Sequence, residues 1–284
     1  MKIIFTLCAL VLTFQLNFAK ELPNVIVSKF KNSSGFRMQT TDSITDSFIS
    51  ILMKTKRFSV FERERLKDIN EEMLRKGKIQ IKGADFAFLN NISTFDIKIS
   101  SKKIPFIKLK RESATIKVQV NVRVVDLKTS KVVFSALGKA EQTKKATKGL
   151  LGVRNSRTAY DNSLVNDVMI EALENLVINI VDNMFPVKVV MVKKEVVFLN
   201  RGKPAGVNIG DIFIVYKKGE KLIDPDTGIN LGSEDKEVAR VEVTETLDKF
   251  SKAKIVGGSL NADSRGMECR KPVVVDSKKK KKRK

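Results

Sequence analysis

A strict alternation of apolar and polar residues marks the middle of the chain. Across residues 115–124 every second position is aliphatic, from Ile116 to Val124, and the positions between them are polar or charged. Side chains of a β-strand point alternately to its two faces, so this period predicts a strand with one buried face. The polar residues 128–131 separate this segment from the apolar residues 132–134, and we expect the two segments to pair as a hairpin.

Shorter patterns before this hairpin alternate between strand and helix. Apolar residues at a spacing of three and four predict a helix that begins near Asp42, with Ser43 as its cap. A second helix is predicted from Glu62, and Gly77 ends it. The predicted strands are residues 24–27, 58–61 and 84–89. This order of elements predicts a mixed α/β (α+β) domain.

The pattern changes again after a long helix, which is predicted over residues 161–184 and ends before Pro186. Short strands separated by turns follow, and they are typical of a small all-β barrel or sandwich. These strands are expected at residues 187–192, 195–199, 212–216, 237–244 and 251–256. The chain is therefore divided into residues 1–19, an α/β domain over 20–186, a β domain over 187–272 and a tail over 273–284.

The first 19 residues have the pattern of a secretory signal peptide. Met1 and Lys2 provide a positive start, residues 3–16 are apolar, and Ala19 precedes the expected cleavage before Lys20. The apolar run is shorter than the ~20 residues that span a bilayer. Cleavage leaves Cys269 as the remaining cysteine, which excludes an intramolecular disulfide. We expect an exported protein in the periplasmic space, with association with the outer membrane left open.

Positive charge is concentrated in two parts of the chain. The formal net charge is +22, and residues 96–160 carry sixteen Lys or Arg against four Asp or Glu, a net of +12. The basic end of the tail adds +7. Such regions attract polyanions, which include nucleic acid, anionic lipids and acidic wall polymers. An exported protein meets little nucleic acid. The candidate contacts with an anionic envelope surface are therefore Lys278, Lys279, Lys280, Lys281, Lys282, Arg283 and Lys284.

The same tail has a simpler interpretation as a solubilising end. Seven consecutive like charges repel one another and offer no apolar surface to bury. We therefore expect the tail to be disordered and dispensable for folding, whichever of the two roles it has.

Catalysis finds little support in the sequence. The chain contains no histidine, the commonest general base and metal ligand, and nothing near Cys269 in the sequence would activate its thiol. Asp224 and Asp226 flank a proline ahead of Gly228 and favour a hairpin turn over a calcium site. Residues 202–210 are glycine-rich, but a strand rather than a helix is predicted after them, which argues against a phosphate loop. We expect no catalytic residue, no cofactor and no bound metal.

Three segments resemble the family of the curli secretion protein CsgG. They are the strand-to-helix segment RFSVFERERL at residues 57–66, KGADFA at 82–87 and the hairpin VNVRVVDLKTSK at 120–131. Ser130 stands where the family usually has glycine. The predicted long helix lies where the family ends its domain, so the resemblance covers residues 20–186.

The β domain resembles the C-terminal domain of the flagellar outer-membrane-ring protein FlgT. The segments that carry this likeness are GVNIGDIFIVY at residues 206–216, LIDPDTG at 222–228 and VARVEVT at 238–244. Both resemblances imply non-enzymatic envelope proteins: secretion-pore subunits, flagellar ring components and activators of wall synthases. Such proteins work in oligomeric assemblies at the outer membrane.

Two departures from the family favour a soluble periplasmic member over a pore. No cysteine stands at the cleavage site for acylation, and residues 97–111 and 138–160 lack the alternation of membrane strands. The resulting expectation is a component of a cell-envelope assembly, of secretion or flagellar-ring type, that acts by binding envelope proteins and forms a homo-oligomer or ring. An outer-membrane secretion channel is the nearest alternative, and a basic nucleic-acid-binding protein is the third.

Overall fold

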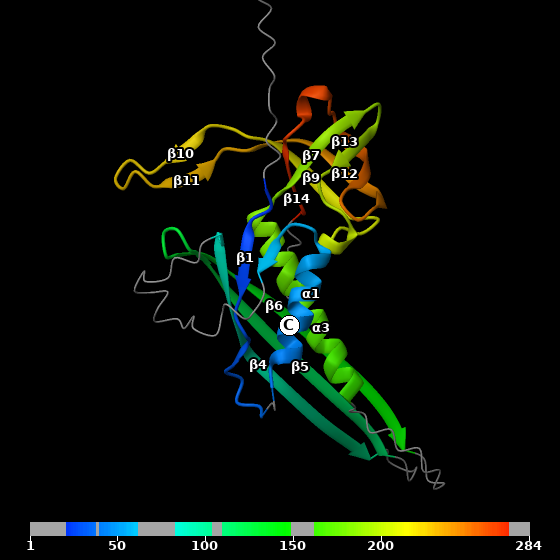
Figure 1. Ribbon diagram of the computed structural model, residues 1–284. Coiled ribbons are helices and arrows are strands. Elements are labelled where there is room, and N and C mark those ends of the chain that lie inside the picture. The colour runs from blue at the N-terminus through cyan, green and yellow to red at the C-terminus, as the bar shows by residue number, and fades with distance from the viewer. Residues whose placement is uncertain (1–20, 38–39, 62–82, 104–109, 149–161, 273–284) are drawn as a thin grey trace, which may run out of the picture.

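The computed structural model describes residues 21–37, 40–61, 83–103, 110–148 and 162–272. The expected signal peptide, the helix predicted from Glu62 and the basic tail lie outside these residues. Figure 1 shows a twisted sheet with two helices against it, and a small barrel beyond the C-terminal end of the longer helix. The expected mixture of α and β structure with a small barrel is confirmed.

The large sheet has a parallel and an antiparallel part. Its strands are β1 (Asn24–Val27), β2 (Lys31–Asn32), β3 (Ser59–Phe61), β4 (Phe86–Lys103), β5 (Lys110–Asp126) and β6 (Lys131–Lys148). The order across the sheet is β3-β1-β4-β5-β6, and β2 pairs with β4. β1 runs parallel to β3 and β4, whereas β4, β5 and β6 are antiparallel.

The three antiparallel strands are longer than the sequence pattern predicts. β4 continues to Lys103, and its ladder with β5 ends at the pair Lys103 and Lys110. β6 continues to Lys148, opposite Lys110. The alternation fades here, yet backbone pairing to a neighbouring strand carries the ladder onward. Cross-strand contacts support it, such as the Lys117–Glu141 ion pair at 3.0 Å.

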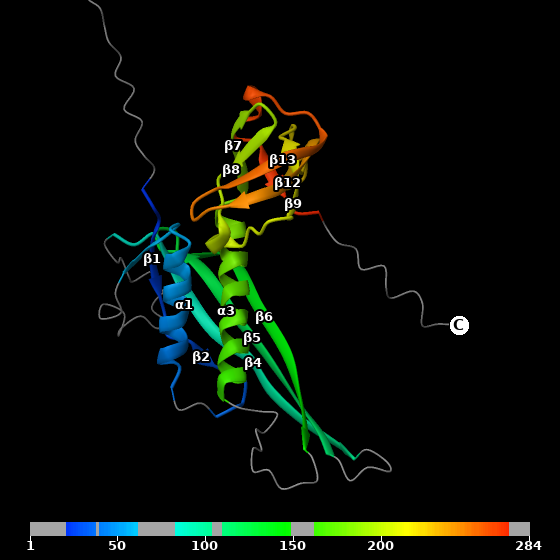
Figure 2. The same ribbon diagram turned by 90° about the vertical axis from the view of Figure 1, so that its right-hand side faces the viewer.

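Both described helices lie on the same face of this sheet, as Figure 2 shows. They are α1 (Asp42–Lys54) and α3 (Asn162–Met184). Neither is long and apolar enough to cross a membrane, and the same holds for every helix in the described ranges. The predicted cap Ser43 is wrong, because Thr41 precedes α1 and its hydroxyl donates to the carbonyl of Phe30 at 2.7 Å. The largest fully buried side chains in this layer include Phe48, Leu52, Phe88, Ile92, Ile116, Leu173, Leu176 and Ile180.

A glycine allows α3 to approach the sheet closely. A Cβ atom on Gly138 of β6 would lie 2.7 Å from Cβ of Leu176 and would also meet the carbonyl oxygen of Ala172. The side chains of Asn175 and Asn179 donate to the β6 carbonyl oxygens of Lys139 and Leu137, at 2.9 and 2.6 Å. The helix therefore satisfies part of the free edge of the sheet.

The C-terminal strands close into a barrel around a second hydrophobic cluster. They are β7 (Val187–Lys193), β8 (Val196–Leu199), β9 (Ile212–Lys217), β12 (Lys236–Thr246), β13 (Ser251–Gly258) and β14 (Glu268–Arg270), in the closed order β12-β13-β8-β7-β14-β9. Two short 3-10 helices, η2 (Lys203–Ala205) and η3 (Ala262–Ser264), complete it. Its buried side chains include Val189, Leu199, Phe213, Val215, Val241 and Cys269.

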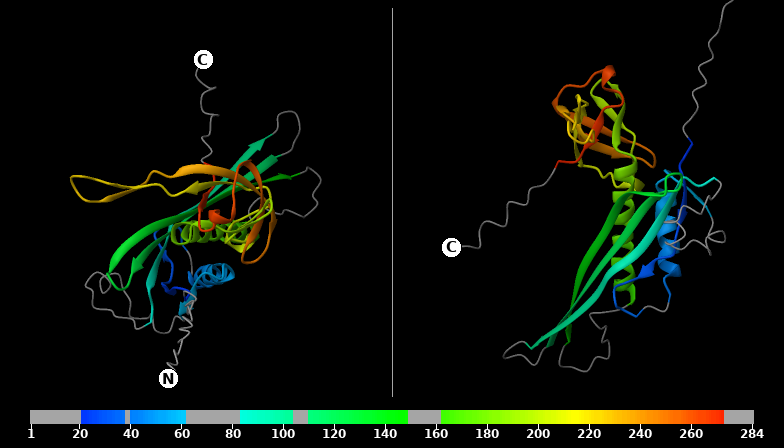
Figure 3. Two further views of the ribbon diagram at one scale, coloured as in Figure 1. Left: turned by 90° about the horizontal axis from the view of Figure 1, so that it is seen from above. Right: turned by 90° about the vertical axis from the view of Figure 1, so that its left-hand side faces the viewer.

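A two-stranded arm projects from the barrel. β10 (Lys221–Ile223) and β11 (Asn230–Ser233) pair only with each other among the described strands, and Figures 1 and 3 show them extending sideways. Asp224 stabilises the turn between them, because its carboxylate accepts the main-chain N–H groups of Asp226 and Thr227 at 2.8 and 3.1 Å. The predicted hairpin turn at Asp224–Gly228 is confirmed.

A residue of the barrel also caps the C-terminal end of α3. Arg201 is 3% exposed, pairs with Asp182 and donates to the main-chain carbonyl oxygens of Val181 and Phe185. The last carbonyl groups of a helix lack partners within it, and this guanidinium supplies one for Phe185, whereas the Val181 carbonyl oxygen also accepts the N–H of Phe185 at 2.8 Å. Ala205 of η2 is buried in the cluster formed by the sheet and helices.

Arg57 contributes to the same junction from the other side. Its guanidinium donates to the carbonyl oxygen of Asn200 and lies 5.7 Å from the centre of the Phe185 ring. Burial, and then the nearby charge of Arg201, lower the pKa of Arg57. The preceding residue, Lys56, forms a surface ion pair with Asp248 at 2.8 Å. The barrel is thus attached to α3 by buried polar contacts as well as by the chain itself.

Candidate functional site

The predicted contacts with an anionic surface, Lys278 to Lys284, lie outside the described residues. Part of the other basic stretch is described. There, several lysines are paired with carboxylates: Lys98 with Asp96 at 3.6 Å, Lys117 with Glu141 at 3.0 Å and Lys128 with Asp85 at 3.3 Å. The positive potential of this stretch is therefore partly neutralised within the sheet.

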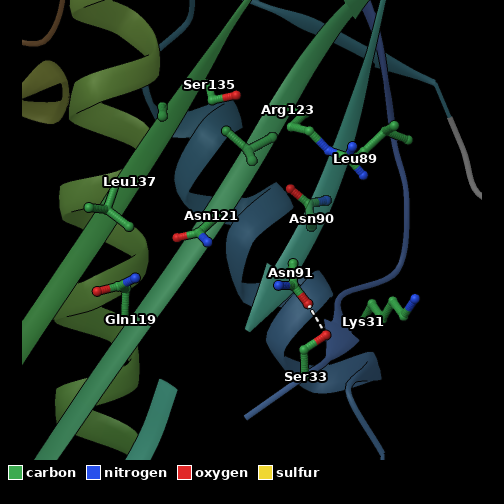
Figure 4. A pocket seen from close by; sticks show the side chains of 12 residues that line it. Lys31, Ser33, Leu89, Asn90, Asn91, Gln119, Asn121, Arg123, Ser135 and Leu137 are labelled. Atoms are coloured by element: carbon green, nitrogen blue, oxygen red, sulfur yellow. Dashed lines mark hydrogen bonds between the residues drawn. The ribbon is translucent and has the colours of Figure 1, made fainter. Parts of the chain in front are cut away.

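The face of the sheet opposite the helices carries a polar groove of about 540 Å³. Figure 4 shows its lining side chains, which come from β4, β5 and β6 and from the segment that contains β2. The polar side chains on this face are amides and hydroxyls, and they include Ser33, Asn91, Gln119, Asn121 and Ser135. The described part of the chain places no helix on this face (Figure 2).

Hydrogen bonds hold several of these side chains in place. The hydroxyl of Ser33 donates to Oδ1 of Asn91 at 2.8 Å, the contact drawn in Figure 4. Nε2 of Gln119 donates to the hydroxyl of Ser93 at 3.0 Å. Amide side chains both donate and accept hydrogen bonds, so a groove of this kind suits ligands rich in polar groups, such as peptide backbone.

Asn90 is next to the groove, but its side chain lies on the other face of the sheet, because its partner in the β4–β5 ladder is Val122, which is buried under the helices. Its side chain is buried, with the residue 4% exposed, and its Nδ2 donates to the carbonyl oxygen of Ser28 at 2.8 Å. Its Oδ1 is buried and has no hydrogen-bond partner among the described residues. A buried acceptor without a partner is costly. This acceptor lies beneath the helices and not in the groove, so a buried water molecule is the partner that would satisfy it.

The charged members of the lining are both basic. In Figure 4 Arg123 lies beside Leu89, whereas Lys31 lies nearer to Ser33 and Asn91. A cation beside a row of amides favours polar partners that carry some negative charge. The arrangement can hold a partner, whereas the groove offers no acid, thiol or imidazole for catalysis within the described residues.

The cysteine thiol and the acidic side chains of the described residues offer little support for catalysis or metal binding. Cys269 is 3% exposed, and burial followed by the neighbouring Glu268 carboxylate raises the pKa of its thiol to about 12. A neutral, buried thiol is a poor nucleophile. Within the described ranges, no group of three or more Cys, Asp or Glu side chains is placed to bind a metal ion.

Sequence reasoning missed this groove because β4 was expected to end at Leu89. Asn90 and Asn91 have low strand propensity, so the pattern appeared to stop before them. The polar face of β5, with Gln119, Asn121 and Arg123, was visible in the alternation. What could not be read was that β4 and β6 place further polar side chains beside it.

The family model described as "Curli production assembly/transport component CsgG" matches residues 14–207. This is more than half of the chain. The chain belongs to the CsgG family. The match includes the sheet, both described helices and the start of the barrel as far as Val207, which follows the η2 segment packed on α3. The expected membership of the CsgG family is thereby confirmed, and the FlgT-like character of the barrel remains a prediction.

Three solved structures that resemble parts of this CsgG-family chain share little sequence identity with it. The LpoB C-terminal domain from Escherichia coli is 10% identical, with 43% of this chain and 84% of that one covered and a TM-score of 0.31. Lipoprotein GNA1162 from Neisseria meningitidis is 14% identical, covering 51% and 91%, with a TM-score of 0.32. A PelC dodecamer from Paraburkholderia phytofirmans is 13% identical, covering 54% and 87%, with a TM-score of 0.29. No curated protein matches the chain.

Proposed function

We propose that this chain is a non-enzymatic, exported component of a cell-envelope assembly and that it acts by binding other envelope proteins. The observation that carries the proposal is the CsgG family match over residues 14–207, whose description is that of an assembly and transport component. The signal-peptide pattern in residues 1–19 supports export. The proposed location is the periplasmic space, and association of the assembly with the outer membrane is the alternative.

The polar groove is the proposed binding site for a partner. Its amides, from Asn91, Gln119 and Asn121, together with Lys31 and Arg123 would receive an extended, polar segment of another protein. This is a recognition surface whose specificity would come from hydrogen bonds rather than from apolar burial.

The barrel is proposed as a second domain, over residues 187–272, with a role like that of the FlgT C-terminal domain. Its own hydrophobic cluster, which includes Val189, Phe213 and Val241, supports a separate folding unit. Under this proposal the chain belongs to a ring-type assembly. The identity of the proteins that co-purify with it distinguishes a secretion assembly from a flagellar one.

One observation keeps an outer-membrane secretion channel as a second candidate. The β4–β5 and β5–β6 ladders continue to Lys103, Lys110 and Lys148, well beyond the strands that the sequence pattern predicts. The exposed Lys144 and Lys145 on successive positions of β6 place charge on both faces, which is unfavourable for a lipid-facing strand. Single-channel steps in planar bilayers from purified protein would favour the channel, and their absence would favour the periplasmic component.

Fractionation of cells tests the proposal itself. The expected result is a processed chain in the periplasmic or outer-membrane fraction, protected from external protease in intact cells and cleaved after the outer membrane is permeabilised. Recovery of the unprocessed chain in the cytoplasm alone would overturn it. A cytoplasmic chain that retains nucleic acid through a wash at physiological salt would instead support the nucleic-acid alternative.

A further inference from the structure

The barrel presents two apolar features that its own fold does not bury. The first is the β10–β11 arm, on which four aliphatic side chains are exposed: Leu222 by 49%, Ile223 by 52%, Ile229 by 60% and Leu231 by 65%. A two-stranded hairpin in water is marginally stable without further packing. An arm that is apolar along much of its length is therefore expected to be covered by a partner.

The second feature is an apolar depression of about 560 Å³ on the β7–β8 side of the barrel. Val190 and Met191 of β7 are 42% and 45% exposed, and they form one side of it. Phe198 and Phe250 lie beside them with ring centres 6.1 Å apart. Arg265 is the one charged side chain that lines the depression. Aromatic and methionine side chains around a hollow are typical of a protein-binding pocket.

The arm and this pocket lie on different sides of the barrel. In Figure 1 the arm extends to the left, whereas the β7–β8 hairpin points to the upper right. The view from above in Figure 3 likewise shows the arm reaching away from the rest of the barrel. One chain cannot fill its own pocket with its own arm. A head-to-tail contact between copies is the arrangement that covers both.

The charges of the arm and of the pocket are complementary. The tip of the arm carries Asp224 and Asp226, and hydrogen bonds from the main-chain N–H groups of Asp226 and Thr227 lower the pKa of Asp224, which keeps it ionised. The pocket carries Arg265, and Lys193, Lys194 and Glu195 follow its lining residue Val192 at the hairpin turn, so this rim has a net positive charge. An acidic tip matches this basic rim. It also disfavours insertion of the arm into an anionic membrane.

We infer that the β10–β11 arm of one copy docks into the Val190–Met191–Phe198–Phe250 pocket of a second copy. The turn at Asp224 already fixes the conformation of the arm, which lowers the entropy lost on docking. Repetition of this heterologous contact builds a ring if the rotation closes and a filament if it does not. The contact is a property of the purified chain, so it stands or falls independently of the cellular location and partners proposed above.

Engineered cysteines test the contact directly. In the full chain carrying Cys8→Ser, one preparation receives Leu231→Cys on the arm and another receives Met191→Cys in the pocket. The native Cys269 is buried, so it does not compete for oxidation. The inference predicts a disulfide-linked dimer when the two preparations are mixed with a mild oxidant, little dimer in either alone, and a ladder of higher species when one chain carries both cysteines.

The matched control is Ile209→Cys, a side chain of the barrel that is 69% exposed. Mixed with Met191→Cys it should give no more dimer than random collision does. The inference is overturned if the Leu231→Cys and Met191→Cys mixture forms no more dimer than this control. It is also overturned if Leu231→Cys links mainly to itself, or if the arm links to another envelope protein or inserts into vesicles of anionic lipid while the chain stays monomeric.

A charge swap gives an independent readout of the same contact. Asp226→Arg and Arg265→Asp are each expected to weaken self-association roughly tenfold in sedimentation, because like charges then face each other. The chain with both changes should recover most of the loss. Melting temperatures close to that of the parent would show that each variant is folded. Equal association of all four chains would contradict the inference.

Discussion

The guanidinium of Arg201 donates a hydrogen bond to the main-chain carbonyl oxygen of Phe185, the residue that follows α3. Arg201 is 3% exposed and also pairs with Asp182, whose side chain is 51% exposed. A residue of the barrel thereby completes the end of the helix that covers the sheet. This contact explains why the barrel and the helix share one junction, with Ala205 packed in the same cluster.

Replacement of Arg201 should therefore destabilise the protein. Arg201→Met keeps the apolar stem but removes the hydrogen bond to the carbonyl oxygen of Phe185, which costs about 1–3 kcal/mol of the free energy of unfolding. Urea unfolding monitored by circular dichroism measures this difference. Arg240→Met is the control, because the exposed pair of Arg240 with Glu237 contributes at most about 1 kcal/mol. An Arg201→Met chain that is as stable as the control would refute the role of the junction.

Substitution of Gly138 should separate α3 from the sheet. The Cβ atom of Gly138→Ala would meet backbone and side-chain atoms of α3 that cannot move without shifting the helix. A loss of about 1–3 kcal/mol is typical of overpacking of this kind. In Gly257→Ala the nearest atom, Cβ of Arg240, would lie 3.9 Å away, so that variant should be as stable as the parent or slightly more stable. Thermal melting of the two variants would show the contrast, and equal melting temperatures would contradict it.

The thiol of Cys269 should react slowly in the folded protein and should make stability depend on alkaline pH. Its folded pKa of about 12 lies above the usual value of roughly 8.5. Between these values the unfolded chain loses a proton that the folded chain keeps. The free energy of unfolding is therefore unaffected below this window and falls as the pH rises through it.

Two measurements check this in the chain with Cys8→Ser. Modification by a thiol reagent at pH 8 should be slow without denaturant and fast in urea. The decline of stability from pH 9 to pH 11 should be smaller in Cys269→Ala than in the parent. Rapid modification of the native protein would show that the thiol is accessible.

Deletion of residues 277–284 tests the proposed role of the basic tail. Because seven like charges have no apolar surface to bury, the deletion should leave the melting temperature nearly unchanged. It should weaken binding to anionic liposomes at low salt, where each basic residue near the surface adds roughly 1 kcal/mol. A lower melting temperature would mean that the tail is structural. Absence of liposome binding by the intact chain would leave the tail as a solubilising end.

Periodicity was sufficient to predict the elements whose burial is one-sided. The alternation around Ile116 and Val124, the stripe of the long helix and the short strands of the barrel all appear in the structure at the expected places. These patterns arise from local geometry and from a single buried face, so they can be read from one segment at a time. Family motifs added the identity of the fold.

The candidate site could not be predicted in the same way. Asn90 and Asn91 belong to β4 only because β5 continues the ladder beside them, which is a long-range effect. The arm was recognised as a turn at Asp224, but its exposed aliphatic side chains and the pocket on the β7–β8 side depend on how the barrel closes. Surfaces made from separate strands have no signature in a single segment of sequence.

The central claim is that this CsgG-family chain binds envelope proteins, and affinity purification from crosslinked cell envelopes tests it most directly. The parent is compared with a groove variant, Gln119→Ala with Asn121→Ala, and with a control, Thr115→Ala with Thr143→Ala, from the same sheet outside the groove. The account predicts that proteins of one envelope assembly are recovered with the parent and the control and are reduced severalfold with the groove variant. Recovery of the chain without envelope proteins, or with cytoplasmic proteins and nucleic acid, would contradict it.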